Sequence, residues 1–267
     1  MEKTALEELQ NVIDTLTAPD GCPWDKEQTP ESLADYIIEE SHELVSAIRS
    51  GNVAEICEEL GDVAFLLLFV ARLYQKRGNF SFDDALNRNR AKMIRRHPHV
   101  FGDTVFKNLE EQLQTWEQIK RAEHAGGPDA PRGLYDSLPA SLPPLLKAYR
   151  IHSKAARVGF TWPEDEEVEQ QVEAEWLEWL DASANGDPEA QKHELGDLLF
   201  SITELGRRKG IKASEALDLA ARRFLRRFAR MEELAREQGR DFTALSLDEK
   251  DELWNLAKAE EKPASTV

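Results

Sequence analysis

Residues 31–48 read ESLADYIIEESHELVSAI, and residues 55–75 read EICEELGDVAFLLLFVARLYQ. In both stretches apolar residues recur every three or four positions, which is the period of an α-helix with one buried face. Residues 214–236, SEALDLAARRFLRRFARMEELAR, repeat this pattern, and the alternation typical of strands is almost absent. The sequence therefore predicts an all-α fold. Capping signals at Thr29 (followed by Pro and Glu) and at Ser81 (followed by two aspartates) predict two helix starts.

Length, charge and cysteine content restrict the class of protein. At roughly 150 residues per domain, 267 residues make one large domain or two ordinary ones. The 34 basic and 51 acidic residues leave a net charge of −17, which repels a nucleic-acid backbone. Two cysteines without a Cys-x-x-Cys pair favour a reducing compartment. Because the amino terminus lacks a signal-peptide pattern, we expect a cytoplasmic protein.

The most apolar stretch covers residues 63–71, VAFLLLFVA. It is far shorter than the roughly 20 residues that a helix needs to cross a bilayer. We therefore predict no membrane association and a buried helix at this position.

The chain is predicted to be a tandem duplication. Residues 126–144, GGPDAPRGLYDSLPASLPP, concentrate helix breakers and predict a linker between domains at 1–125 and 145–267. A shift of 135 residues brings seven identical pairs into register across this linker. They are Glu40, Glu43, Glu59, Leu60, Gly61, Asp62 and Phe65, matched by Glu175, Glu178, Glu194, Leu195, Gly196, Asp197 and Phe200. Residues shared by the two copies are the ones to examine for function.

Each copy contains two acid pairs separated by fifteen residues. Glu40 and Glu43 are three residues apart, which makes them neighbours on one helix face. Fifteen residues suffice to end that helix, turn and begin an antiparallel one, so that Glu59 and Asp62 would meet the first pair. Asp62 also begins an apolar segment, where an ionised acid is costly unless it is paired or binds a metal. Glu175, Glu178, Glu194 and Asp197 repeat the arrangement.

The acid clusters predict a divalent metal site that binds phosphates. Carboxylate oxygens without cysteine or paired histidine suit Mg²⁺ or Mn²⁺, and magnesium shares its remaining positions with substrate phosphates. Basic residues on later helices would hold phosphate oxygens, and two tryptophans, each followed four residues later by lysine, would stack on a base. These substrate-binding candidates are Lys92, Arg95, Arg96, Trp116 and Lys120 in the first copy, and Arg223, Arg226, Arg227, Trp254 and Lys258 in the second.

These motifs resemble the MazG nucleoside triphosphate pyrophosphohydrolases. The family hallmark, Glu-Glu-x-x-Glu followed by Glu-x-x-Asp, is matched by EESHE at 39–43 and ELGD at 59–62. GCPWDKEQT at 21–29 and RRHPHVFGD at 95–103 are also similar to MazG sequences. The second copy has Ala174 where the motif has its first Glu.

The resemblance implies hydrolysis of a nucleoside triphosphate, ATP among them, to the monophosphate and diphosphate. It also implies two tandem MazG-type domains whose helical bundle is completed by homodimerisation. Metal-assisted attack by water would use a carboxylate to orient the water or accept its proton. Glu39 is the catalytic candidate in the first copy, and Glu175 and Glu178 are the candidates in the second.

Two other interpretations remain open. One or both copies could bind a nucleotide or dimerise as a regulator without catalysis. A di-iron carboxylate bundle is the rival enzyme, because Glu39-x-x-His42 fits its Glu-x-x-His ligand pattern, although the second copy has Ala174 and Leu177 there. Iron content and diphosphate release would separate the three.

Overall fold

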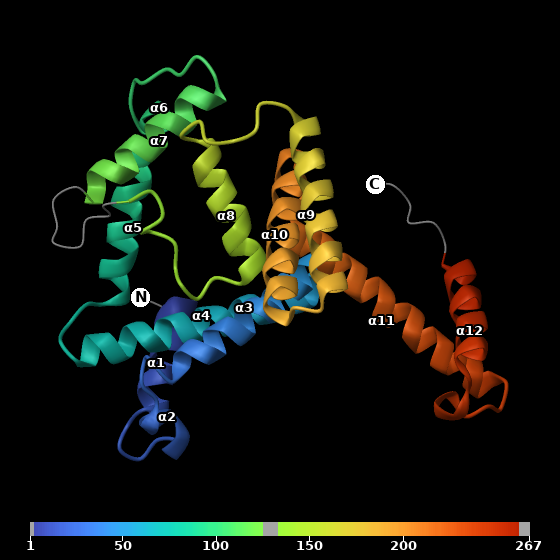
Figure 1. The fold of residues 1–267 in the computed structure, drawn as a ribbon. Helices are drawn as coiled ribbons and strands as arrows, with labels where there is room; N and C mark the ends of the chain where they lie inside the picture. The colour runs from blue at the N-terminus through green and yellow to red at the C-terminus, as the bar shows by residue number, and fades with distance from the viewer. Residues whose placement is uncertain (1–2, 125–132, 262–267) are drawn as a thin grey trace. The chain divides into compact units, whose positions relative to one another are not determined.

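Helices make up all the regular structure in the part of the chain that the computed structural model describes, residues 3–124 and 133–261 (Figure 1). Side chains at 110, 114, 117, 120, 121 and 124 are outside this description. The chain divides into two units, Met1–Ala122 and Glu123–Val267. The prediction of an all-α chain with two tandem helical domains is confirmed.

The first unit is organised around a long antiparallel hairpin of α3 and α4, with α1 packed on α4 and α5 following it. Its helices are α1 (Ala5–Leu16), α2 (Pro23–Glu27), α3 (Leu33–Ser50), α4 (Val53–Lys76), α5 (Phe82–Arg96), α6 (Pro98–Phe101) and α7 (Leu109–His124). Ile13, Leu33, Leu66, Leu68 and Phe69 form its buried core.

The second unit repeats the hairpin with α9 and α10, and α8 packs on α10 as α1 packs on α4. Its helices are α8 (Pro144–Ala156), α9 (Asp165–Asn185), α10 (Pro188–Arg208), α11 (Ala213–Glu237) and α12 (Leu247–Glu260), with a short 3₁₀ turn at Phe242–Ala244. The carboxy-terminal half of α11 packs on α12 around Met231, Leu234, Ala235, Leu253 and Ala257.

A glycine and an Asx residue make the hairpin turn in both units. Gly51 ends α3 with φ 75°, and Asn52 caps α4 by accepting a hydrogen bond from the Ala54 N–H at 3.2 Å. Gly186 ends α9 with φ 70°, and Asp187 caps α10. Glycine adopts this left-handed conformation at little steric cost, and the Asx side chain satisfies a free N–H of the next helix. This two-residue connection turns the chain back on itself.

The units differ in the charged contact that holds the flanking helix to the hairpin. In the first unit, the Arg72 guanidinium on α4 donates two hydrogen bonds to Asp14 on α1, one of them at 2.6 Å. In the second unit, Arg207 donates at 2.6 and 2.8 Å to Glu204, one helical turn earlier on α10. His152 of α8 lies 3.5 Å from the same carboxylate. The carboxylate of this contact is buried in the second unit, where Glu204 is 1% exposed.

Three local predictions had different outcomes. The start at Ser81 is confirmed, because Ser81 and Asp84 form a capping box on α5. The start at Thr29 is wrong by a turn, since α3 begins at Leu33 and Thr29 exchanges hydrogen bonds with Ser32 in the turn before it. The prediction of a buried helix at residues 63–71 is correct for one face only: Phe69 is buried, whereas Leu67 is 45% exposed.

The predicted linker at residues 126–144 falls partly outside the described residues, which resume at Gly133. From there to Pro143 the chain forms turns and bends, and α8 begins at Pro144. None of the described helices has both the length and the apolar character that a bilayer crossing requires.

Candidate metal centres on two helical hairpins

The hairpin turns place the acid pairs opposite each other. Glu43 and Glu59 each lie eight residues from Gly51, and Glu40 and Asp62 each lie eleven residues from it. In an antiparallel hairpin, residues equally far from the turn lie at the same height, here on facing sides about two to three turns along each helix. Glu175, Glu178, Glu194 and Asp197 have the same spacing around Gly186.

Three carboxylates converge in the first unit. Oxygen atoms of Glu40, Glu59 and Asp62 all lie within 4.8 Å of one another. Glu40 and Glu59 are half-buried, while Asp62 is exposed. The expectation that Asp62 lies among apolar side chains is therefore wrong, because its face of α4 is open. Glu39 is exposed, and its charge acts on Glu40.

The negative charges in this cluster act on one another. Burial raises the pKa of Glu40, and the charges of Glu43, Asp62 and Glu39 raise it further. Burial also raises the pKa of Glu59, and the charges of Glu43, Glu40 and Asp62 raise that pKa further. Glu43 thus acts on the cluster through its charge. A bound divalent cation would relieve this repulsion.

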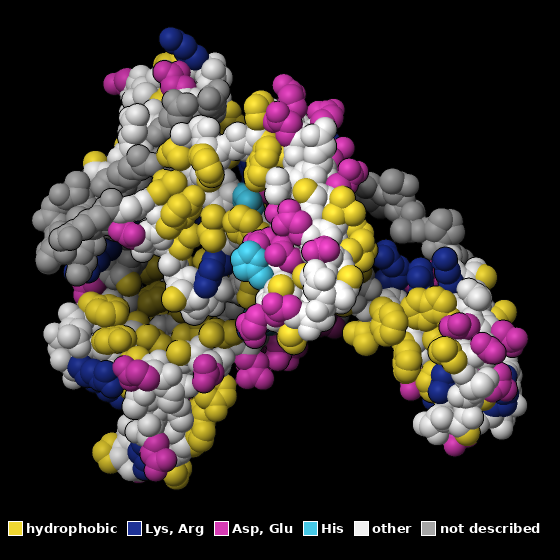
Figure 2. Space-filling view, viewed as in Figure 1, with side chains coloured by type: hydrophobic (Ala, Val, Ile, Leu, Met, Phe, Trp, Pro, Cys, Tyr) yellow, Lys and Arg dark blue, Asp and Glu magenta, His cyan; other side chains and the backbone are white. Residues whose placement is uncertain are grey.

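In the second unit two groups of ligand atoms share one residue. Glu175, Glu178 and Glu194 form the first group, and His193, Glu194 and Asp197 form the second, each within 4.8 Å. Gln171 donates a hydrogen bond of 2.7 Å to Glu175. Figure 2 shows acidic side chains gathered over the α9–α10 hairpin, with histidine side chains beside them.

His193 was not among the residues singled out from the sequence. It occupies the position that Glu58 holds in the first copy, one residue before the shared Glu-Leu-Gly-Asp. Identity between the copies does not indicate this position, because the two copies differ there. The signal in the sequence is a difference directly before the shared motif.

A cavity of about 570 Å³ opens beside the second cluster. Glu178 and Glu194 line one part of it, and Asp181, Asn185 and Asp187 line the part toward the hairpin turn. This volume is within the range of small-molecule sites. The cluster therefore borders space that a ligand can enter.

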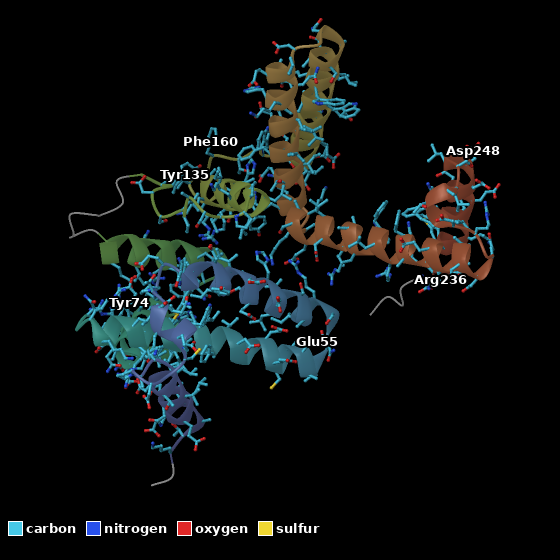
Figure 3. All side chains as sticks on the ribbon, turned by 90° about the horizontal axis from the view of Figure 1, so that it is seen from below. Glu55, Tyr74, Tyr135, Phe160, Arg236 and Asp248 are labelled. Carbon is cyan, nitrogen blue, oxygen red and sulfur yellow. The ribbon has the colours of Figure 1, made fainter. Side chains whose placement is uncertain are left out.

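Two basic residues of the second copy pair with Glu261, the residue that follows α12. Arg226 and Arg227 donate to Glu261 at 3.1 and 2.8 Å, and the Arg227 guanidinium lies 5.5 Å from the centre of the Trp254 ring. Arg223 and Lys258 are exposed. Arg236 and Asp248, labelled in Figure 3, lie near the connection between α11 and α12. Within the described residues, the ion pairs of Arg226 and Arg227 are with Glu261, which caps the end of α12, and not with the four acids.

The first copy contains the same arginine–tryptophan contact. The Arg96 guanidinium on α5 lies 5.2 Å from the centre of the Trp116 ring on α7. Lys92 is half-buried and Arg95 is exposed on the same helix, while the Lys120 side chain is outside the described residues. In both copies, therefore, an arginine already covers one face of the tryptophan that we expected to stack on a base.

The chain is an all-α protein with two tandem helical domains, and each domain carries a hairpin with converging carboxylates. Residues 28–101, which contain the first hairpin, match a family model described as "MazG nucleotide pyrophosphohydrolase domain". The chain is 39% identical over 252 residues to a Thermotoga maritima protein named "Nucleoside triphosphate pyrophosphohydrolase/pyrophosphatase MazG", covering 94% of this chain and 95% of the relative. The chain belongs to the MazG family.

Other relatives match over a similar stretch of this chain. An Escherichia coli K12 protein named "Nucleoside triphosphate pyrophosphohydrolase" is 36% identical over 261 residues, or 96% of this chain and 98% of the relative. "Uncharacterized protein YabN" of Bacillus subtilis is 39% identical over 95% of this chain, which corresponds to 52% of that relative. Both matches extend across the two acidic hairpins.

Proposed function

We propose that the chain hydrolyses nucleoside triphosphates to the monophosphate and diphosphate, using divalent cations held by the acidic hairpins. The observation that carries this proposal is the duplicated convergence of carboxylates from two antiparallel helices. The names of the Thermotoga maritima and Escherichia coli relatives support the reaction. His42, which the di-iron alternative requires, is not a member of the three-residue group of the first unit.

The donor atoms of the first cluster fit a hard cation. Glu40, Glu59 and Asp62 offer only carboxylate oxygens, which suits Mg²⁺ or Mn²⁺. Glu43 adds negative charge beside them. When bound, such a cation lowers the pKa of a coordinated water and offsets charge on the phosphate chain.

A carboxylate of the site accepts the proton that the attacking water loses. The water oxygen forms a bond to the α-phosphorus while the bond to the α–β bridging oxygen breaks, so that diphosphate leaves. Glu39 would take this role in the first unit, since it is exposed and its charge acts on Glu40. In the second unit, where Ala174 stands, the role falls to Glu175 or Glu178.

The basic residues bind the phosphates and take up charge on the leaving diphosphate. Arg226 and Arg227 would do so in the second unit by exchanging the Glu261 carboxylate for phosphate oxygens. Arg223 and Lys258 add exposed positive charge. In the first unit the same roles belong to Lys92, Arg95, Arg96 and Lys120. Trp116 and Trp254 would stack on a base by exchanging their arginine contacts for it.

The proposal includes a homodimer of chains with domains at 1–125 and 145–267. The hairpin of the second unit leaves apolar side chains exposed, among them Leu177 at 63%. A second copy of the chain would cover them and complete the bundle.

The reaction is tested by incubating the chain with a panel of nucleoside triphosphates and Mg²⁺ and separating the products by chromatography. We expect monophosphate and diphosphate, and no turnover after chelation. Nucleoside diphosphate plus orthophosphate as primary products would contradict the reaction, and activity that survives chelation would contradict the metal. Binding of a triphosphate without any product would favour the regulatory alternative.

A further inference from the structure

We propose that His193 makes the second acidic hairpin a mixed nitrogen–oxygen site that selects transition-metal ions over Mg²⁺, unlike the oxygen-only site of the first hairpin. The proposal rests on the divalent-cation part of the proposed function and not on hydrolysis. The Nδ1 atom of His193 lies 3.4 Å from an oxygen of Glu194 and 3.2 Å from an oxygen of Asp197. These three side chains present their ligand atoms within 4.8 Å of one another.

Helix geometry brings the three side chains together. His193 and Asp197 are four residues apart on α10, so that they share one face, and Glu194 adjoins them. The His193 side chain is 73% exposed, which leaves it accessible from solvent. Glu194 also belongs to the group formed with Glu175 and Glu178, so the histidine borders the same carboxylates that would hold the cation.

The comparison with the first copy isolates the histidine. Both copies contain Glu-Leu-Gly-Asp, at residues 59–62 and 194–197, but the preceding residue is Glu58 in one and His193 in the other. Imidazole nitrogen favours first-row ions toward the Zn²⁺ end of the series, whereas Mg²⁺ favours carboxylate oxygen and water. One difference directly before the shared motif therefore gives the two domains different metal preferences.

The test measures binding of Co²⁺ and Mg²⁺ to the metal-free, full-length chain by calorimetry. We expect His193→Gln to weaken Co²⁺ binding at one site about tenfold and to change Mg²⁺ binding less than about threefold. Glutamine is a good helix former, so this exposed change leaves α10 intact. Two swaps serve as matched variants: His193→Glu should lower the Co²⁺ preference of the second site, and Glu58→His should raise that of the first.

A spectroscopic measurement distinguishes ligation from indirect effects. The Co²⁺-loaded chain should show a hyperfine-shifted, solvent-exchangeable imidazole N–H proton that is absent in His193→Gln. Unchanged Co²⁺ affinity with this resonance retained would overturn the proposal. Equal losses of Co²⁺ and Mg²⁺ binding would also overturn it, since His193 would then only position the carboxylates. Altered Co²⁺ binding in a chain that hydrolyses no triphosphate would support the metal site and contradict the proposed function.

Discussion

Glu194 lies in both ligand groups of the second hairpin, whereas its counterpart Glu59 lies in the one group of the first. We expect the second site to carry most of the turnover, so that Glu194→Gln lowers triphosphate hydrolysis at least about tenfold and Glu59→Gln has little effect. The second copy also carries the richer basic helix, with Arg222, Arg223, Arg226, Arg227 and Arg230. Ala174 is expected to lower the activity of the second copy, because it stands where the first copy has the carboxylate of Glu39.

The two variants are matched, since each neutralises the same position of one motif. Steady-state hydrolysis and Mg²⁺ binding should be measured for both. The opposite pattern would assign turnover to the first domain. Equal partial losses would mean that both sites are active.

The charge repulsion around Glu40 predicts an effect of pH and metal on stability. Its pKa in the folded chain is raised, by burial and then by Glu43, Asp62 and Glu39. A carboxyl group with a raised pKa favours the folded state at low pH, and this contribution is lost as pH rises through the folded pKa. At neutral pH the ionised group therefore destabilises the metal-free chain.

We expect Glu40→Gln to raise the melting temperature in the presence of a chelator and to reduce the further rise caused by Mg²⁺. Thermal unfolding at pH 5 and pH 7 measures both effects, and the benefit of the substitution should be larger at pH 7. A lower melting temperature for the chelated variant at pH 7 would refute the repulsion.

For individual residues, the sequence predicts which acidic side chains converge better than it predicts what surrounds them. The repeated spacing was sufficient to bring Glu40, Glu59 and Asp62 together, because helix periodicity and a short turn determine it. It could not predict that Asp62 is exposed, which depends on the side of α4 that the core leaves open. The pairing of Arg227 on α11 with Glu261, 34 residues later at the end of α12, has no local signal in the sequence.

Among the structural elements, the hairpin turns depend on one backbone conformation. Gly51 has φ 75°, and an alanine there would be strained. We expect Gly51→Ala to lower the unfolding free energy of the first unit by about 1–2 kcal/mol. Gly61→Ala is the control, because a Cβ at Gly61 meets nothing within 4 Å. Since Gly61 lies inside α4, this change should stabilise by about 0.5–1 kcal/mol. Urea unfolding of both variants checks the prediction, which fails if both shift the midpoint equally.

The buried Glu204 contact should matter more than its exposed counterpart. Glu204→Gln leaves the Arg207 charge without its carboxylate, and we expect a loss of about 3 kcal/mol. Asp14→Asn removes the partner of Arg72 at a site where Asp14 is 35% exposed, and we expect a loss of under about 1 kcal/mol. Urea unfolding of each variant measures the difference, and equal losses would contradict the effect of burial.

The same contact has a pH dependence of opposite sign to that of Glu40. Burial raises the pKa of Glu204, but the Arg207 guanidinium, His152 and Thr161 outweigh burial and hold the pKa below its usual value. A lowered pKa stabilises the fold above the unfolded value, and this stabilisation is lost as pH falls through the folded pKa. The acid-side loss of stability should therefore be smaller in Glu204→Gln than in the unaltered chain.

Helix boundaries were predictable only where one residue makes the cap. Ser81 does so directly and its prediction is confirmed, whereas Thr29 and Ser32 bind each other's backbone and delay the start of α3. The apolar run at residues 63–71 shows the same limit. Its composition predicts burial on all sides, but packing within the chain covers one face.

For the whole molecule, these uncovered faces predict self-association. Leu177 is 63% exposed on α9 and Leu225 is 65% exposed on α11. We expect sedimentation at micromolar concentration to give twice the 30.4 kDa mass of one chain. Leu177→Glu should shift the equilibrium toward monomer, while Val105→Glu, at an exposed position outside the hairpins, should not. A 30.4 kDa species for the unaltered chain would contradict the dimer.

The carboxylate that holds the flanking helix is Asp14 on α1 in the first unit but Glu204 on α10 in the second. This difference affects which flanking helix can pack on which hairpin. Docking α1 onto α10 would set Asp14 against the buried Glu204, and docking α8 onto α4 would set His152 beside Arg72 with no carboxylate between them. The first exchange would place two carboxylates together, and the second would leave Arg72 without a carboxylate beside an imidazole whose pKa burial lowers. We therefore expect each flanking helix to pack on its own hairpin in preference to the hairpin of the other unit.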